Sequence, residues 1–273
     1  MDDNFIVTAY CIISESLDKF GHQSHKLARL SDAEILTVAV VAAKFFNSHQ
    51  ERALCLMIKT GYIRPLSASR YNRRLHALAD VLEGVLDILA GLYSQGEVFV
   101  IDSVPAPVCK RVRARRCRKL RGKVYCGYCA AKKEKFFGWR LHLICDVRGM
   151  PVSYSLLEAS YHDLTPLHEL SFVLPREAIL YGDKGYISAR DTASLAADTG
   201  VVLVTPKRKN MKEENTLSEL FGLQRYRKRI ETVNSQLESM GVQRLRARTN
   251  KGFFIKVSAA LFALACTNLH ELD

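Results

Sequence analysis

The chain of 273 residues is long enough to bury one large core or two smaller ones, and its hydrophobic fraction of 48% excludes a mainly disordered protein. No run of about 18 or more apolar residues occurs, so we expect no membrane-spanning segment. Lysine and arginine outnumber aspartate and glutamate by 40 to 28, and the net charge of +12 predicts a polyanionic partner, nucleic acid ahead of anionic lipid.

The first residues and the cysteines bear on the compartment. The segment 1–3 contains two acids, unlike the basic start of a secretory signal, so we expect an intracellular, cytoplasmic protein. Eight cysteines in such a chain should be mostly reduced thiols, and any special role would be metal binding rather than disulfide formation.

Residues 1 to about 95 are expected to be almost entirely helical, because apolar residues recur there at helical spacing. One helix start is especially clear, since Ser31 and Glu34 have the spacing of a capping box. The predicted helices cover residues 5–20, 35–46, 50–60 and 67–93, the last as one continuous helix.

The front of the last of these helices is basic. Arg70, Arg73 and Arg74 accompany an aromatic residue, and such a segment can lie on DNA as a recognition helix. Alternatively, these side chains form a solvated charged face of a helical bundle. A glycine-bounded segment near residue 95 then divides the chain into a helical, DNA-binding domain over 1–95 and a second domain over 96–273.

The second domain begins with a strand-rich pattern. The apolar run Val98–Ile101 lies between Gly96 and Pro105 and predicts a strand that is buried on both faces. Asp102 ends this run, either as a turn residue or as a carboxylate at the tip of a central strand. A loop is predicted to follow over 105–135.

Beyond that loop, the sequence predicts an antiparallel pair of strands and then strands that alternate with helices. Since the later strands are reached by helical crossovers, the fold class is α/β, a mixed sheet covered by helices. The predicted strands are 136–146, 151–157, 178–181 and 201–204, the predicted helices are 162–172, 189–198, 225–240 and 252–269, and a polar, basic linker covers 207–220.

Three acidic residues are candidates for a metal site. Asp102 and Asp183 each end a short apolar strand, and Glu231 lies beside the buried stripe of the 225–240 helix. Converging carboxylates in a basic protein suit Mg²⁺, and two such ions about 3.5–4 Å apart can activate the attacking oxygen and stabilise the leaving one in phosphoryl transfer. Alternatively, the aspartates are turn residues and Glu231 pairs with Arg227 four residues earlier.

The loop over 105–135 is strongly basic and contains four cysteines. From Cys109 onward it has twelve lysines and arginines and one acid, so we expect it to contact phosphates, with a solvated basic loop as the alternative. Cys126 and Cys129 have metal-ligand spacing, but Cys109 and Cys117 do not form a second tight pair. The four cysteines are therefore either ligands of a structural zinc or free thiols in a loop. The predicted DNA contacts of the loop are Arg113, Arg115, Arg116, Arg118, Lys119 and Arg121.

Other polar residues have ordinary interpretations beside functional ones. Lys184, next to the second aspartate, could orient DNA or be a surface turn residue. His142 alternates with buried leucines and is predicted to be a strand-face histidine rather than a ligand. His162 and Asp163 precede Pro166 and are predicted to start a helix.

In their order and spacing, the segments IDSVPAPVC, KFFGWRLHLICD, YGDKGY and RKRIETVNSQLE resemble the DDE transposases of bacterial insertion sequences, most closely the insertion-sequence family numbered nine-eighty-two. This resemblance implies an RNase H-like catalytic core that cleaves DNA and transfers strands at terminal inverted repeats. It also implies Mg²⁺, for which Mn²⁺ can substitute, and an assembly of two or more subunits on nucleoid DNA. Carried over position by position, the catalytic and metal-binding triad is Asp102, Asp183 and Glu231.

The third acid departs from the Tyr-x2-Arg-x3-Glu-x6-Lys pattern that related transposases often show. Arg227 and Glu231 fit this pattern, and Arg227 is a further predicted DNA contact. Gln224 stands in place of the tyrosine and Glu238 in place of the lysine, so the departure concerns the neighbouring positions more than Glu231. Two other functions suit these residues: a metal-dependent nuclease without strand transfer, and a non-catalytic DNA-binding protein derived from a transposase.

Overall fold

The computed structural model describes residues 2–130, 132–208, 211 and 214–270. It divides into two compact units, one of residues 1–93 with 236–273 and one of residues 94–235. Four residues of the predicted polar linker, 209, 210, 212 and 213, lie outside the described residues.

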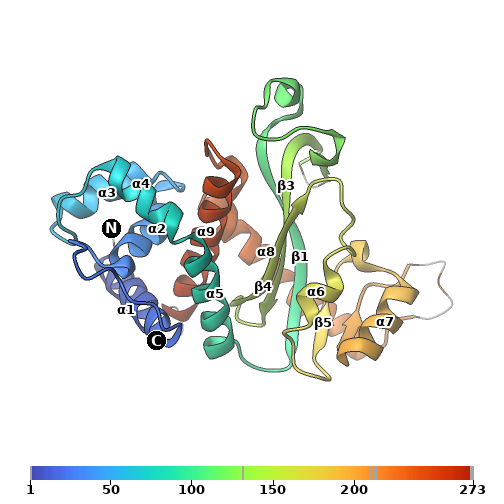
Figure 1. The fold of residues 1–273 in the computed structure, drawn as a ribbon. Helices are drawn as coiled ribbons and strands as arrows, with labels where there is room; N and C mark the ends of the chain where they lie inside the picture. Colours follow the sequence, from blue (N-terminus) through green and yellow to red (C-terminus); the bar gives the residue numbers. More distant parts are fainter. Residues whose placement is uncertain (1, 131, 209–210, 212–213, 271–273) are drawn as a thin grey trace. The chain divides into compact units, whose positions relative to one another are not determined.

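The first unit is built from helices (Figure 1). The predicted capping box is present, because Ser31 Oγ accepts from the Glu34 N–H while Glu34 accepts from the Ser31 N–H. The helices are α1 (Asp3–Lys19), α2 (Asp32–Phe46), α3 (Gln50–Lys59), α4 (Ala68–Ala77), α5 (Ala79–Tyr93) and α9 (Asn250–His270), with the short 3-10 helix η4 (Val242–Arg244).

The predicted continuous helix over 67–93 is wrong, because the chain leaves helical geometry at Leu78, with φ −91° and ψ 10°. Leu75, Leu78 and Leu82 are all buried on the two sides of this break. The apolar spacing therefore continues through it, which is why the sequence pattern does not reveal it.

The closing helix α9 packs with the N-terminal helices rather than within the second domain, where the sequence placed it. It contacts α1, α2 and α5, and its residues 259–266 are almost completely buried. A helix that is apolar on all sides needs partners on all sides, and these helices supply them. The segment Asn250–Leu269 is long and apolar enough to cross a membrane, but 83% of its most apolar window is buried inside the fold, as in a core helix.

The second unit is built on a six-stranded mixed sheet, which confirms the predicted α/β class for this unit (Figure 1). The central strand β3 (Glu134–Asp146) pairs antiparallel with β1 (Val98–Lys110) on one side and with β4 (Pro151–Glu158) and β2 (Cys126–Cys129) on the other. The short strand β5 (Ile179–Tyr181) pairs parallel with β1, and β6 (Val202–Val204) pairs parallel with β5. Helices α6 (Leu167–Ser171) and α7 (Ala189–Thr199) form the crossovers between β4, β5 and β6.

The predicted loop over 105–135 is partly strand. β1 continues to Lys110, and the segment then forms the 3-10 helices η1 (Arg111–Arg116) and η2 (Lys123–Tyr125) before β2. Pro105 and Pro107 are tolerated because, among the described residues, β5 pairs only with Val98–Val100, so the rest of β1 has a free edge on that side.

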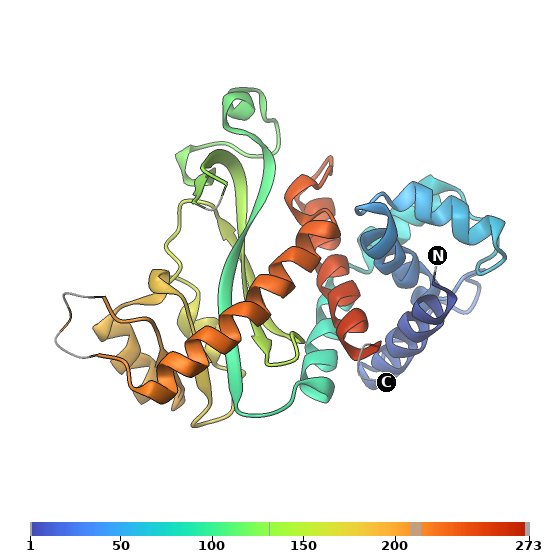
Figure 2. The ribbon, with the colours of Figure 1, turned by 180° about the vertical axis from the view of Figure 1, so that it is seen from behind.

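The long helix α8 (Leu217–Ser239) lies across the sheet (Figure 2). Adjacent residues of a strand point to opposite faces: Ile101 joins the apolar cluster formed with α6 and α7, whereas Asp102 bonds to α8. α8 approaches the sheet closely at Gly222, where a Cβ would lie 2.2 Å from the Tyr181 hydroxyl oxygen, and Tyr226 packs on the same ring at 5.0 Å between centroids. The absence of a side chain at position 222 therefore sets how closely α8 lies to β5.

Substitution of Gly138 tests the register between β1 and β3. It pairs with Pro107 beside an irregularity in β1, and a Cβ there would lie 2.6 Å from the Val108 backbone nitrogen and 2.7 Å from the Ala106 backbone oxygen. Because backbone atoms must move, we expect Gly138→Ala to lower the free energy of unfolding of the full chain, measured in urea, by about 1–3 kcal/mol. Gly91→Ala in α5, where no atom lies within 4 Å of the added Cβ, is the control and should be neutral or stabilising. Equal stability of the two variants would contradict this register.

Candidate active site

Two of the predicted acids lie where β5 ends beside β1. Val100 pairs with Tyr181, the last residue of β5, so Asp102 and Asp183 each follow the same rung of the parallel pair by two residues. The sequence predicted Asp102 at the end of the strand. In the structure it lies within β1, which continues to Lys110. Its special position comes from the end of its neighbour, β5, which leaves the edge of β1 open at this level.

Asp102 is held by two donors in a largely buried setting. Its Oδ1 accepts from the Ser103 N–H at 2.7 Å, and its Oδ2 accepts from Asn234 Nδ2 of α8, also at 2.7 Å. Burial raises the pKa of Asp102 to about 6; the two hydrogen bonds oppose this rise, and the negative charges of Asp183 and Asp163 add to it. The side chain is thus a largely buried carboxylate placed near two other carboxylates.

Asp183 occupies a tight turn with more solvent contact. Its Oδ1 accepts from the Gly185 N–H at 2.7 Å, at the start of the 3-10 helix η3 (Lys184–Tyr186). Burial is the largest cause that raises the pKa of Asp183; Asp163 raises it further, and the guanidinium groups of Arg227 and Arg140 lower it. The predicted DNA contact Lys184 is exposed beside it.

Asp163 is a third aspartate at this site, although its sequence neighbours predict the start of a helix. That helix forms only from Leu167, and Asp163 lies in the turn after β4. Its charge raises the pKa values of both Asp102 and Asp183, which places it near them. The sequence signal was weak: an acid a few residues beyond a strand, the same kind of position that marked the other two aspartates.

Polar groups of β3 lie behind Asp163. Its Oδ1 is 3.8 Å from His142 Nδ1 and 4.0 Å from Arg140 Nη1. His142 is completely buried, and burial lowers its pKa to about 4, so the ring is neutral at pH 7. Arg140 is engaged elsewhere, because it donates to Ser103 Oγ at 3.2 Å and to the Tyr128 carbonyl at 3.1 Å.

The third predicted acid, Glu231, is not brought to the aspartates. Its side chain is 59% exposed and accepts from Arg227 Nε at 2.9 Å, which is the ion pair that the sequence offered as the alternative. Asn234, one turn later on α8, is the residue that bonds to Asp102. Among the residues that the structure describes, no three His, Cys, Asp or Glu side chains are arranged to hold a metal ion.

The predicted DNA contacts differ in their availability. Lys119 is half-buried, and burial lowers its pKa, whereas the other five predicted contacts of the segment are exposed: Arg113, Arg115, Arg116, Arg118 and Arg121. On α4, Arg70 and Arg73 are exposed, but Arg74 pairs with Asp32 and donates to the Leu30 carbonyl at 2.8 Å. Arg74 is therefore a structural residue within the helical unit.

The four cysteines of this segment are not brought together. Cys109 and Cys117 are hydrogen-bonding neighbours, whereas Cys126 and Cys129 lie on β2. Cys109 and Cys126 both pair with Phe137, from opposite sides of β3, so a strand separates them. The structure does not form the suggested zinc site, since no three such ligands gather among the described residues.

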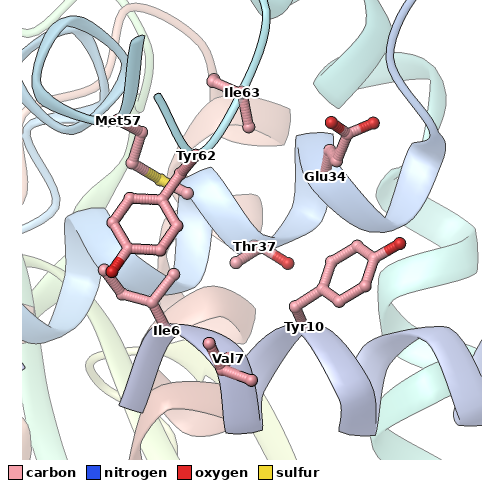
Figure 3. A pocket seen from close by; sticks show the side chains of 8 residues that line it. All are labelled: Ile6, Val7, Tyr10, Glu34, Thr37, Met57, Tyr62 and Ile63. Atoms are coloured by element: carbon pink, nitrogen blue, oxygen red, sulfur yellow. The ribbon is translucent and has the colours of Figure 1, made fainter. Parts of the chain in front are cut away.

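A pocket of about 260 Å³ in the helical unit is a different kind of site (Figure 3). Tyr10 and Tyr62 lie on either side of Thr37, and most of the wall is apolar. Glu34 is the only acid of the lining, and its carboxylate already accepts from the Ser31 N–H in the cap of α2. This pocket therefore lacks the convergent polar groups of a catalytic site. Its lining is Ile6, Val7, Tyr10, Glu34, Thr37, Met57, Tyr62 and Ile63.

Comparison with known proteins gives a family for the sheet-containing unit. A family model described as "Transposase DDE domain" matches residues 93–249, more than half of the chain. No curated protein matches. Among solved structures, the piggyBac transposase in a synaptic complex with hairpin DNA aligns with a TM-score of 0.48 at 10% identity, over 99% of this chain and 67% of that one. The Mos1 transposase in a paired-end complex with its left transposon end aligns with a TM-score of 0.26 at 12% identity, over 81% of this chain and 80% of that one.

The pKa of Asp102 predicts a pH-dependent cost of folding. A value raised from 3.8 to about 6 means that the folded chain binds this proton more tightly than the unfolded chain, so stability is lost as pH rises from about 4 to about 6. At pH 8, without divalent cations, we expect Asp102→Asn to be more stable than wild type by up to about 3 kcal/mol, at about 1.4 kcal/mol per pKa unit. Thermal unfolding between pH 4 and pH 8 measures this; a variant less stable than wild type at pH 8 would contradict the described environment of Asp102.

Proposed function

Because the chain belongs to the family of transposase DDE domains, we propose that it cleaves DNA at the ends of an insertion sequence and joins those ends to target DNA. The observation that carries this proposal is the pair of aspartates, Asp102 and Asp183, each two residues beyond the paired residues Val100 and Tyr181 of neighbouring parallel strands. Both lie within the matched residues 93–249.

The strand order supports an RNase H-like core as part of this proposal. Three antiparallel strands, β4, β3 and β1, are followed by β5 and β6, which run parallel to β1. On the resemblance of its motifs, we assign the chain to the insertion-sequence family numbered nine-eighty-two, which would place it in the bacterial cytoplasm on nucleoid DNA.

The aspartates suit a divalent metal ion as cofactor. Asp102 and Asp183 offer hard oxygen ligands, the buried Oδ1 of Asp163 has no hydrogen-bond partner among the described residues, and burial with neighbouring negative charge raises the pKa of Asp102. Mg²⁺, or Mn²⁺ in its place, would be held by Asp102, Asp183 and Glu231. When bound, it would activate the attacking oxygen and stabilise the leaving one at the phosphodiester.

For Glu231 to bind the metal ion, it would have to give up only a weak ion pair. Its present partner is Arg227, and both side chains are largely exposed, so their ion pair is weak. On α8, Glu231 lies between Arg227, whose charge acts on Asp183, and Asn234, which bonds to Asp102. If Glu231 joined the two aspartates, its ion pair would break and Arg227 would be free to contact a phosphate.

The other residues position the site and the DNA. Asn234 and the Ser103 N–H hold Asp102 in one orientation through its two oxygens. The exposed arginines around η1 follow β1 beyond Asp102 and supply positive charge for the DNA backbone. We propose terminal inverted repeats and target DNA as the partners, bound by a dimer or a larger assembly of this chain.

The cleavage assay on element-end DNA with Mg²⁺ tests this function. We expect Asp102→Asn and Glu231→Gln each to reduce strand cleavage by about 100-fold or more, because each removes a ligand that stabilises the transition state. Glu238→Gln, two turns from Glu231 on the same stripe of α8, is the matched control and should keep most of the activity.

The same assay, followed by a test of joining to target DNA, can contradict the proposal in three ways. Cleavage by Asp102→Asn near the wild-type rate would exclude a metal site at this carboxylate. Loss of cleavage in Glu238→Gln but not in Glu231→Gln would move the third acid two turns along α8. Cleavage without joining to target DNA would indicate the metal-dependent nuclease instead of the transposase.

The arginines around η1 predict a salt-dependent DNA affinity. We expect Arg115→Gln with Arg116→Gln to lower affinity and to flatten the log-log salt dependence by about 0.9 for each lost phosphate contact. The matched control is Arg176→Gln with Arg190→Gln, which removes two exposed arginines from the same unit. Fluorescence anisotropy over a range of salt concentrations measures both slopes, and equal slopes for the two double variants would exclude this segment from the DNA interface.

A further inference from the structure

Asp163 and Asp183 face each other across Gly185. A Cβ at Gly185 would lie 2.8 Å from Asp163 Oδ2 and 2.9 Å from Asp183 Oδ1. Two carboxylate oxygens from separate segments, the turn after β4 and the turn after β5, therefore border the same small space. That space exists because position 185 has no side chain.

The backbone conformation does not explain why residue 185 is a glycine. Gly185 is not among the glycines with a positive φ, so its conformation is open to other residues. The reason for a glycine is therefore space: alanine would push the two carboxylates away. A gap kept open between two negatively charged groups, which repel each other, indicates that something positive belongs there.

Among the described residues, the charge of Asp163 is countered only at long range, by Arg140 at 4.0 Å. Its Oδ1 is buried and accepts no hydrogen bond from the described residues, and the nearest nitrogen, His142 Nδ1, belongs to a ring whose pKa of about 4 leaves it neutral. Arg140 is 4.0 Å away and donates to two other oxygens.

Two completely buried side chains next to this acid also lack partners. Both ring nitrogens of His142 and the hydroxyl of Tyr186 make no hydrogen bond with the described residues. Tyr186 is close enough to Asp163, Asp102 and Asp183 for all three charges to raise its pKa. Polar groups buried without partners beside an acid are unusual, and they indicate that the region is completed by something other than the protein.

We propose that Asp163 and Asp183 bind a divalent cation across Gly185, so that Asp163 is a further metal ligand of the transposase site. The inference rests on the proposed function, because Asp183 is shared between the two. Carboxylate oxygens are the ligands that Mg²⁺ and Mn²⁺ prefer. Since neither aspartate depends on Glu231 for its position, this cation binds in the absence of DNA, while Glu231 is still paired with Arg227.

Mn²⁺ binding to the full chain without DNA tests the inference, with free Mn²⁺ measured by electron paramagnetic resonance. We expect Asp163→Asn to weaken binding by about tenfold or more. Gly185→Ala should weaken it similarly although every carboxylate remains, because the methyl group fills the space. Asp198→Asn is the matched control: Asp198 is an acid of the same unit, 3.6 Å from His168 Nδ1, and its loss should leave Mn²⁺ affinity unchanged.

Wild-type Mn²⁺ affinity in Asp163→Asn or in Gly185→Ala would overturn the inference, as would the absence of Mn²⁺ binding to the wild-type chain without DNA. Circular dichroism shows whether Asp163→Asn is folded. If it is not, the Mn²⁺ affinity of Gly185→Ala decides the test, because this variant changes no charge. The proposed function fails separately, if Asp102→Asn still cleaves element-end DNA. Unchanged Mn²⁺ binding in Asp163→Asn together with inactive Asp102→Asn would refute only the role of Asp163.

Discussion

The burial of neighbouring carboxylates at the end of β5 is the constraint on which this site depends. The register of the sheet fixes Asp102 and Asp183 at one level, and Asp163 is near both of them. Arg140 and Arg227 lower the pKa of Asp183, but they do not reverse the effect of burial, and the pKa of Asp102 still rises to about 6. The fold thus bears an unfavourable charge arrangement at one place, which is common at functional sites and which a bound cation would relieve.

The helix α8 links this charge arrangement to the proposed reaction. It lies close to β5 because Gly222 admits the Tyr181 ring, and this approach lets Asn234 reach Asp102. The same helix holds Glu231 in an exposed ion pair, one turn away from Asn234. Glu231, the third acid of the proposed triad, is therefore held only by an exposed ion pair. Asp102, Asp183 and Asp163 are instead held by the sheet and its turns.

Local patterns predicted most of the elements, and the failures have physical causes. The capping box at Ser31 and the alternation over 136–146 depend on neighbouring residues only, so they could be recognised directly. The strand character of Pro105–Lys110 depends on where β5 stops, and the placement of α9 depends on which helices can surround it. Both facts depend on residues that are distant in the sequence, so a local pattern cannot predict them.

The same distinction applies to the site. Asp102 and Asp183 could be predicted because each follows an apolar run, and parallel pairing then brings them together. Asp163 could not, since its neighbours in sequence resemble a helix start and its neighbours in space, His142 and Gly185, come from other elements. The sequence also offered both states of Glu231, and the structure shows its ion pair with Arg227.

The most direct test of a cation-dependent site at the end of β5 is anomalous scattering from crystals of the chain grown with Mn²⁺. We predict an anomalous peak at coordination distance, about 2.1 Å, from carboxylate oxygens of Asp102 or Asp183. Ordered Mn²⁺ found elsewhere, with both aspartates bonded only to protein donors, would contradict the account.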